Sequence, residues 1–503
     1  MIEGIAQSYW MASSDPTSYP ALTEPAEVDV AVVGGGIAGL ATAWELARAG
    51  RAPVVLEADR IAAGVTGFTT GRLSAAHPWI YRPLRDSLGP DVARLYARSQ
   101  QEAVERVERT ARELGLDCDL ERRPSHVYVE SPDRVDALKT ETEAVQEAGL
   151  PASFVTGTDL PYEVAGAMRV EDQLQFHPRR YLLGLAEDLV RRGGRVHERT
   201  RVVEVAEESG DRPHVLTTSD GVTVTAREVV IATLFPIIES ALLSFRLTPL
   251  RELVIAAPID ADDDPGAMYI TRQENTRSVR TAPYGDGRRL LLVTGESFSP
   301  GDDDVARHQR ELVAWTREHF KVGDIEYWWS AQDLDTSDKI PYVGAVADRL
   351  YVATGYARSG MSHGIMSGRL LAGLITGDPP EWADLYDPRR AHPRREARPM
   401  LSAGMTNMRR FLEDRARVRS GSLDDIALGS GEVIRHGGRH CAAYRDEDGT
   451  PHVVSARCTH MACLVAFNAT ERVWECPCHG SRFAVDGSVL QGPATTDLAP
   501  VDP

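Results

Sequence analysis

Apolar and polar positions in this chain switch between the two-residue period of strands and the longer period of helices. The run VDVAVV at 28–33 predicts a buried strand, a helical pattern follows at about 37–49, and PVVLEAD at 53–59 predicts a second strand. A strand–helix–strand unit of this size is typical of a parallel sheet. Farther along, the spacing predicts helices at about 89–114, 131–148 and 177–194, and antiparallel strands over 245–300.

Changes in composition divide the chain into four parts. Residues 1–27 are rich in Ser, Pro and Thr, and we expect them to form an N-terminal arm. Residues 28–390 carry the alternating strands and helices of one large unit. The stretch 391–421 is strongly basic with little apolar content, which indicates a linker. Residues 422–503 combine short strands, turns and a cluster of cysteines, which indicates a separate small domain.

Net charge limits the partners of the protein. The chain has 503 residues and a formal net charge of −18. An acidic surface repels nucleic-acid phosphates and anionic lipids, so we expect neither a nucleic-acid nor a membrane partner. The first twenty residues lack the basic region and apolar run of a secretion signal, and the apolar stretch 30–44 is too short to span a bilayer. A cytoplasmic location is therefore expected.

The turn after the first strand carries a dinucleotide-binding pattern. Its sequence, Gly34-Gly35-Gly36-Ile37-Ala38-Gly39, matches G-x-G-x-x-G between a predicted strand and a predicted helix. Gly34 permits the tight turn, Gly36 lets the backbone approach a pyrophosphate, and Gly39 lets helix and strand pack closely. Glu57 ends the second strand, where an acid accepts a ribose hydroxyl. The alternative is a glycine-rich turn without a ligand. The chain lacks the second fingerprint that NAD(P)H would need, which favours FAD.

Four segments together resemble the D-amino-acid oxidase type of FAD-dependent oxidoreductase, the group that includes glycine oxidase, sarcosine oxidase and gamma-glutamylputrescine oxidase. They are VDVAVVGGGIAGLATAWELA (28–47), GVTGFTTGRLSAAH (64–77), DTSDKIPYVG (335–344) and GYARSGMSHGIMSG (355–368). The resemblance implies an α/β, Rossmann-like FAD-binding domain at about 28–80, 175–240 and 330–375. It implies an antiparallel-sheet substrate domain at about 80–175 and 240–330. The implied FAD contacts, beyond the glycine turn, are Thr66, Thr69, Thr70, Val203, Gly355, Gly360, Met361 and Ser362.

The departures from the family pattern concern the catalytic residues and the loop 66–72, called the flavin loop below because the resemblance implies that it runs beside the flavin ring. Some relatives attach FAD covalently through a histidine where this chain has Phe68, so non-covalent FAD is expected. Arg72 stands where other relatives have lysine, and it either stabilises a reduced flavin anion, binds a substrate carboxylate or caps the loop. His363 is a candidate base or flavin-facing donor, with a structural role at a helix start as the alternative. Tyr269 is a candidate substrate-binding residue, with an ordinary strand position as the alternative.

Four of the six cysteines lie within 21 residues near the C-terminus, in the segments CTHMAC (458–463) and CPCHGS (476–481). Two thiolates with two imidazoles can hold either a [2Fe–2S] cluster or a structural zinc ion. The two segments resemble the Rieske family, in which two cysteines bind one iron and two histidines bind the other. The resemblance implies a small all-β domain with Cys458, His460, Cys476 and His479 as ligands. It also implies a disulfide between Cys463 and Cys478.

Both sites together predict an enzyme. A flavin takes up two electrons at once, and a [2Fe–2S] cluster carries one. We therefore predict an FAD-dependent oxidoreductase that oxidises a C–N bond of an amine or amino acid and passes electrons from FAD to the cluster and on to an acceptor. The C–N bond comes from the family resemblance alone. One alternative is a flavin oxidase that uses O₂ directly, with a structural or regulatory cluster. The other is an electron-transfer protein that feeds a partner oxygenase.

Overall fold

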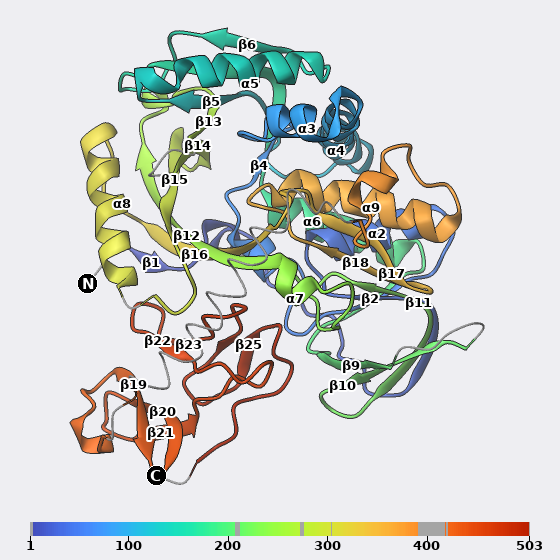
Figure 1. The fold of residues 1–503 in the computed structure, drawn as a ribbon, viewed down its shortest axis with the longest axis vertical. Helices are drawn as coiled ribbons and strands as arrows, with labels where there is room; N and C mark the ends of the chain where they lie inside the picture. The colour runs from blue at the N-terminus through green and yellow to red at the C-terminus, as the bar shows by residue number, and fades with distance from the viewer. Residues whose placement is uncertain are drawn as a thin grey trace.

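Two large sheets and a small all-β unit make up the protein (Figure 1). The computed structural model describes residues 4–206, 212–271, 276–302, 304–390, 418 and 421–501. The fold class predicted from the sequence is confirmed. The expected linker at 391–421 lies outside the described residues, apart from Val418 and Gly421.

The first large sheet contains the predicted strand–helix–strand unit. Its central strand β2 (Ala26–Val33) ends in four buried residues, the continuous apolar run that a strand covered on both faces requires. Strand β2 pairs in parallel with β3 (Val54–Leu56) and with β11 (Thr223–Ile231). The outer strands are β8 (Arg195–His197), β9 (Val202–Ala206), β10 (His214–Thr218), β17 (Tyr342–Ala347) and β18 (Leu350–Thr354).

Helices cover this sheet and form the largest core. Helix α2 (Ile37–Arg48) contacts α6 (Pro178–Arg191) and α9 (Gly360–Thr376). Helix α4 (Pro90–Leu114) packs on the outside of α9, and the whole group buries one continuous apolar cluster. The three long helices expected from the spacing are present as α4, α5 (Val135–Glu147) and α6, whereas α3 (Tyr81–Leu88) was not expected.

The second large sheet is mostly antiparallel, as predicted, with two parallel pairs at β1–β16 and β13–β5. Helix α5 covers one end of it and α8 (Val305–His319) flanks its side (Figure 1). Strand β4, which follows the flavin loop, joins its edge, so the loop connects the two sheets. The strands run in the order β1 (Ile5–Ala6), β16 (Tyr327–Thr336), β12 (Leu247–Ile259), β15 (Arg288–Phe298), β14 (Arg277–Tyr284), β13 (Met268–Thr271), β5 (Glu121–Val129), β7 (Gly166–Gln175) and β4 (Arg72–Leu73), with β6 (Ala152–Val155) on β7.

The N-terminal segment is packed against the body of the protein, although the sequence suggested an arm. Helix α1 (Tyr9–Ala12) buries both Tyr9 and Trp10. The Ser8 hydroxyl donates to the Gly67 carbonyl at 2.5 Å, and the Trp10 indole donates to the Thr69 carbonyl at 2.6 Å. This segment therefore supports the flavin loop from behind.

The C-terminal unit lies next to β12, β16 and the short helix α7 (Leu243–Arg246) (Figure 1). It consists of a three-stranded and a four-stranded antiparallel sheet. The first is formed by β19 (Ser430–His436), β20 (Arg439–Arg445) and β21 (Pro451–Ser455). The second is formed by β22 (Ala466–Asn468), β23 (Val473–Glu475), β24 (Arg482–Phe483) and β25 (Val489–Gln491).

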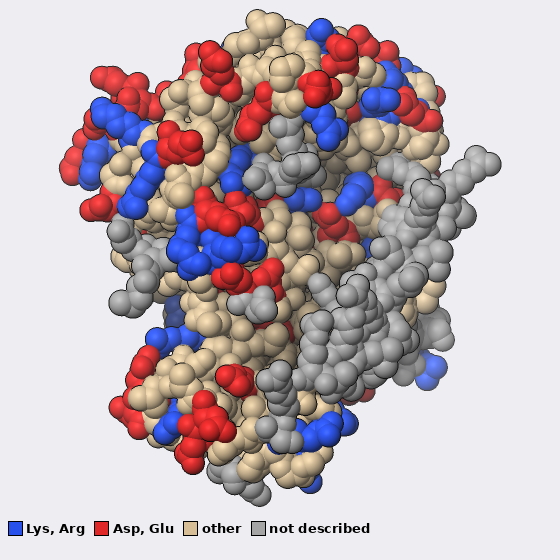
Figure 2. Space-filling model, turned by 60° about the vertical axis from the view of Figure 1, so that its left-hand side comes forward, with Lys and Arg blue, Asp and Glu red and all other residues tan. Residues whose placement is uncertain are grey.

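On the face drawn in Figure 2, acidic and basic side chains are interspersed over the large and the small part of the molecule. Among the described residues, no helix is both long enough and apolar enough to cross a membrane.

Candidate functional site: a flavin cavity beside a cluster domain

The glycine turn has the geometry that a dinucleotide needs. Gly34 has a φ of +105°, which favours glycine, and a Cβ there would lie 2.4 Å from the Ala232 carbonyl oxygen. A Cβ on Gly39 would lie 1.9 Å from the Gly34 carbonyl oxygen, so helix α2 can start this close to the strand only with glycine. The Ile37 amide donates to the Thr66 hydroxyl at 3.0 Å, which ties the helix start to the flavin loop.

Replacing Gly39 with alanine is expected to remove FAD and destabilise the protein. The added methyl group would overlap a carbonyl oxygen of the turn, so the backbone has to shift, at a cost of about 1–3 kcal/mol. Flavin content after purification and denaturant unfolding check both effects. Gly157→Ala is the control, because a Cβ there meets nothing within 4 Å. Full flavin content in Gly39→Ala would show that the close approach is dispensable.

One large cavity runs from this turn to the second sheet. Glu57 lines it and accepts hydrogen bonds from the Gly35 amide at 2.6 Å and the Asp59 amide at 2.9 Å. Burial raises the pKa of Glu57, and those two amide hydrogen bonds oppose the shift. The predicted FAD-binding residues that line the cavity are Gly34, Gly36, Ile37, Ala38, Glu57, Thr66, Thr69, Thr70, Gly355, Gly360, Met361 and Ser362.

Two of the predicted FAD-binding residues lie outside the lining. Gly39 is covered by the Gly34 carbonyl and acts through packing. Val203 is absent from the lining, whereas its neighbours Arg201 and Val202 line the cavity. Sequence reasoning also missed Thr233, Leu234 and Ile237, which follow strand β11 and line the cavity.

The three predicted catalytic residues are spread over different environments. Arg72 lines the cavity, and its guanidinium donates to the Ser125 hydroxyl at 2.7 Å and the Ala76 carbonyl at 2.9 Å. Tyr269 points into the core on the other face of β13, where its hydroxyl donates to the Pro265 carbonyl and its ring stacks on His126. Its neighbour Ile270 lines the cavity instead, because strand side chains alternate. His363 follows Ser362 in α9 and is buried. It lines a second cavity, which is also lined by Trp79 and Tyr96.

The wall formed by the second sheet carries charged groups that the sequence did not reveal. Glu252 projects from β12 into the cavity and accepts from the Arg358 guanidinium at 3.1 Å and the Ser297 hydroxyl at 2.8 Å. Asp333 lies beside them, and its enclosure raises its pKa to about 7 despite hydrogen bonds from the Leu334 and Arg358 amides. This wall therefore offers both signs of charge to a substrate.

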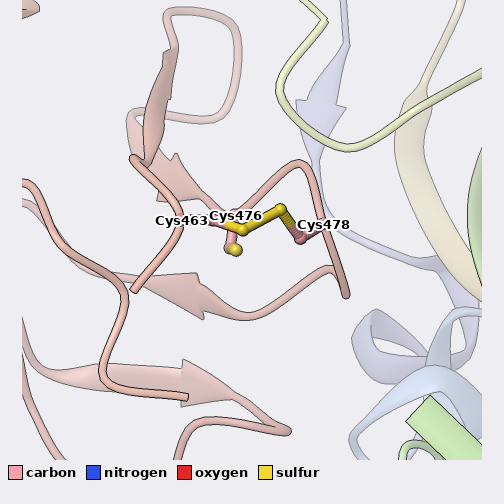
Figure 3. A group of neighbouring side chains, drawn as sticks. All are labelled: Cys463, Cys476 and Cys478. Atoms are coloured by element: carbon pink, nitrogen blue, oxygen red, sulfur yellow. A yellow bond between two sulfur atoms is a disulfide. The ribbon is translucent and has the colours of Figure 1, made fainter. Parts of the chain in front are cut away.

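The four expected cluster ligands form two close pairs in the C-terminal unit. The thiols of Cys458 and Cys476 are hydrogen-bonded to each other, and the imidazole rings of His460 and His479 lie 4.8 Å apart between centroids. The predicted disulfide between Cys463 and Cys478 is present, and Figure 3 shows it directly beside Cys476. It joins the two ligand-bearing loops.

These residues fit an iron–sulfur cluster. Within the described residues, the Nδ1 atoms of both His460 and His479 are buried without a hydrogen-bond partner, as expected of atoms that bind metal. Burial lowers the pKa of both histidines, to about 4 for His479, which keeps the imidazoles neutral for binding. The hydrogen bond between the two thiols lowers the pKa of Cys458 and raises the pKa of Cys476, so Cys458 is the one that more readily becomes a thiolate.

The histidine side of the cluster site faces the flavoprotein part. The ring of Phe235, which is 1% exposed, lies 6.0 Å from the ring of His460 and 5.5 Å from that of His479. His479 is also hydrogen-bonded to the backbone of Ser244 in α7. Phe235 follows directly after Thr233 and Leu234 of the cavity lining.

Gln332 is a second link between the two sites. It lines the flavin cavity, and a Cβ on Gly480, next to His479, would lie 2.4 Å from its amide nitrogen. Both polar atoms of the Gln332 amide are buried without a hydrogen-bond partner in the described part of the chain, so the amide fits a polar group of a bound cofactor. Residues of the C-terminal unit complete the cavity itself: Leu490, Gln491, Gly492, Ala494 and Thr495.

A buried ion cluster holds the two parts together. Arg251 projects from β12 on the face opposite Glu252 and pairs with Glu475 and, at 3.0 Å, with Glu471. The Ser330 hydroxyl donates to Glu471 at 2.6 Å, and Arg482 pairs with the same carboxylate. Strand β12 thus presents one face to the flavin cavity and the other to the cluster domain.

This combination defines a flavoprotein oxidoreductase with an attached iron–sulfur domain. The chain belongs to the FAD-dependent oxidoreductase family, whose model matches residues 29–374, and it carries a Rieske [2Fe-2S] domain over residues 417–502. FAD and a [2Fe–2S] cluster are accordingly its cofactors. The resemblance that the sequence motifs indicated is confirmed for both parts.

The similarity to one relative extends over nearly the whole chain, and two other proteins match about three quarters of it. The chain is 31% identical over 501 residues to the putative Rieske 2Fe-2S iron-sulfur protein YhfW of Bacillus subtilis, covering 99% of this chain and 97% of that protein. It is 29% identical to gamma-glutamylputrescine oxidoreductase of Escherichia coli, covering 74% and 89%. The fold of glycine oxidase from Geobacillus kaustophilus matches 73% of this chain and 100% of that one, with a TM-score of 0.60 at 22% identity.

Proposed function

We propose that this protein oxidises a C–N bond of an amine or amino acid and passes the electrons from non-covalently bound FAD through the Rieske cluster to a one-electron acceptor. The observation that carries the proposal is the contact of both histidine ligands with Phe235, in the segment that lines the flavin cavity. A one-electron carrier placed against a two-electron carrier is the arrangement that a relay requires.

The proposed substrate class rests on relatives and on the cavity wall. Similarity to gamma-glutamylputrescine oxidoreductase supports an amine, and Glu252 offers a carboxylate to an ammonium group. FAD supplies the oxidising power by taking hydride equivalents from the carbon next to nitrogen. The chain's own residues bind and orient: Arg72 fixes the flavin loop to β5, and the packed cluster domain closes one side of the cavity.

An anaerobic spectral titration tests this proposal. The holoprotein is mixed with a panel of amines and amino acids while the flavin and cluster bands are recorded. We expect a substrate to bleach the flavin and the cluster bands to fade in the same reaction. Flavin bleaching alone, reversed by air, would contradict the relay and favour a direct oxidase. A flavin that nothing on the panel bleaches would contradict the C–N assignment.

A further inference from the structure

A segment of the cluster domain lies at the end of the flavin cavity that carries Glu57. The guanidinium of Arg201, which lines the cavity, donates to the Val489 carbonyl at 3.0 Å. Burial raises the pKa of Glu57, and the charge of Arg201 is among the influences that oppose this rise. Arg201 therefore connects Glu57 to residues 489–495, called the closing segment below. Five residues of the closing segment line the cavity: Leu490, Gln491, Gly492, Ala494 and Thr495.

This end of the cavity is where the glycine turn directs the AMP half of FAD. In the dinucleotide-binding fold, the pyrophosphate lies at the turn, and the acid at the end of the second strand accepts a ribose hydroxyl of the adenosine. The acid here is Glu57, and Gly34 and Gly36 of the turn line the same cavity. The closing segment thus borders the space for the AMP half of the cofactor.

One side chain of the closing segment has an unused hydrogen-bond donor. Gln491 lines the cavity, and its side-chain nitrogen is buried without a hydrogen-bond partner among the described residues. An amide nitrogen carries two donors, and leaving a buried donor unpaired is costly. The phosphate oxygens, ribose hydroxyls and adenine nitrogens of a dinucleotide are acceptors. Gln491 is therefore matched to bound FAD in both position and chemistry.

The other side of the closing segment is fixed to the cluster site. The Ala494 amide donates to the Ser481 hydroxyl at 3.0 Å, and Ser481 is also hydrogen-bonded to the thiol of Cys458. Ala494 is 2% exposed and belongs to the same apolar core as Cys458 and Cys476. Because these contacts fix the closing segment to its own domain, it can leave the flavin cavity only if the whole domain moves.

We propose that Gln491 of the cluster domain is an FAD-binding residue, which donates hydrogen bonds from its side-chain amide to the AMP half of the cofactor. Bound FAD then holds the cluster domain against the flavoprotein part, and the docked domain slows the release of FAD. Such coupling is reciprocal, so each of the two contacts strengthens the other by the same factor. This inference goes beyond the proposed function, because it depends on the cofactors alone and holds for any substrate and any electron route.

The rate of FAD release from the holoprotein tests this contact. The rise in flavin fluorescence after strong dilution measures the rate. Gln491→Leu removes the amide and keeps a side chain of similar size. We expect FAD to leave about 10-fold faster, because a buried hydrogen bond to the cofactor is lost. The absorption bands of the flavin that stays bound should not change, because the AMP half carries no part of the chromophore. An unchanged release rate would overturn the contact, and shifted flavin bands would overturn its assignment to the AMP half.

Thr496→Val is the matched control. Thr496 directly follows the closing segment, is exposed and does not line the cavity. We expect this variant to release FAD at the rate of the unaltered protein. Equal acceleration in Thr496→Val and Gln491→Leu would overturn the contact, because it would show a general effect on the domain. The cluster absorption bands of each variant report whether the cluster domain is folded.

Hydrogen exchange in the unaltered protein tests the coupling without any substitution. Exchange of the backbone amides of residues 489–495 is compared in the full chain with and without FAD, with the cluster retained. We expect removal of FAD to speed this exchange by about 10-fold or more, because the docked domain opens more often. Equal exchange with and without FAD would overturn the coupling. Neither measurement involves substrate oxidation, so its failure is distinguishable from a failure of the proposed function.

Discussion

Replacing Cys458 with serine is expected to abolish the cluster and lower turnover with a one-electron acceptor by about 100-fold or more, while the substrate still bleaches the flavin. In the proposed ligand set this thiolate is one of two that hold an iron, and the flavin cavity is lined by none of the four proposed ligands. Iron content, the cluster bands and stopped-flow flavin bleaching measure these effects. Cys441→Ser is the control, because Cys441 is a buried free cysteine of the same domain.

A second variant covers the case in which the C-terminal domain unfolds without its cluster. Phe235→Ala keeps all four ligands and removes the ring between the cluster site and the flavin cavity. We expect a full cluster and slower electron transfer from the flavin. Unchanged turnover with a one-electron acceptor in Cys458→Ser would contradict the relay. Unchanged turnover with O₂ would identify a direct oxidase.

Replacing Arg251 with methionine is expected to detach the cluster domain from the flavoprotein part. Burial lowers the pKa of Arg251 to about 10, so it stays charged at neutral pH. Without it, the buried Glu475 and the partly buried Glu471 have less charge compensation, which costs about 3–5 kcal/mol. We expect a lower unfolding free energy and slower electron transfer from flavin to cluster, with unchanged cluster bands. Arg435→Met, at an exposed position of the same domain, is the control.

A double variant tests the mechanism behind this effect. Adding Glu475→Gln to Arg251→Met removes an uncompensated carboxylate and should restore part of the lost stability.

The pH dependence of stability provides another check on the ion cluster. Burial raises the pKa of Glu471, but the charges of Arg251 and Arg482 outweigh it and lower the pKa to about 2. Its stabilising effect is therefore present above the unfolded pKa and is lost between about pH 4.5 and 2. An unchanged free energy of unfolding in Arg251→Met would contradict the stabilising role of the ion cluster.

The sequence predicted the parts of both sites whose residues are neighbours along the chain. The glycine turn and the two cysteine–histidine segments are local motifs, and their geometry follows from a few adjacent residues. The cavity wall was different, because Glu252 and Tyr269 depend on which face of a strand turns inward. The face of a strand that turns toward the cavity is set by packing between distant strands. In β13 this packing places Tyr269 in the core and Ile270 in the wall of the flavin cavity.

The contact between the two domains had almost no sequence signal. Arg251 resembles an ordinary charged strand residue until Glu471 and Glu475, more than 200 positions later, are placed beside it. Phe235 likewise follows an apolar strand, and its contact with His460 and His479 is visible only in the structure. The N-terminal segment had one overlooked signal, the adjacent aromatic residues Tyr9 and Trp10, which are large enough to require burial.

The flavoprotein part covers the histidine side of the cluster site, and this has a consequence when other redox proteins are present. Because Phe235 and the Ser244 backbone occupy that side, a foreign donor cannot approach the ligands from there. The cluster domain and the flavoprotein part belong to one chain and are in fixed contact. The flavin site is therefore always present at a high effective concentration beside the cluster site, and no diffusional encounter is needed. In the proposed relay, the supply of electrons to the iron–sulfur cluster would then depend on the rate of turnover at the flavin and would not depend on the protein concentration.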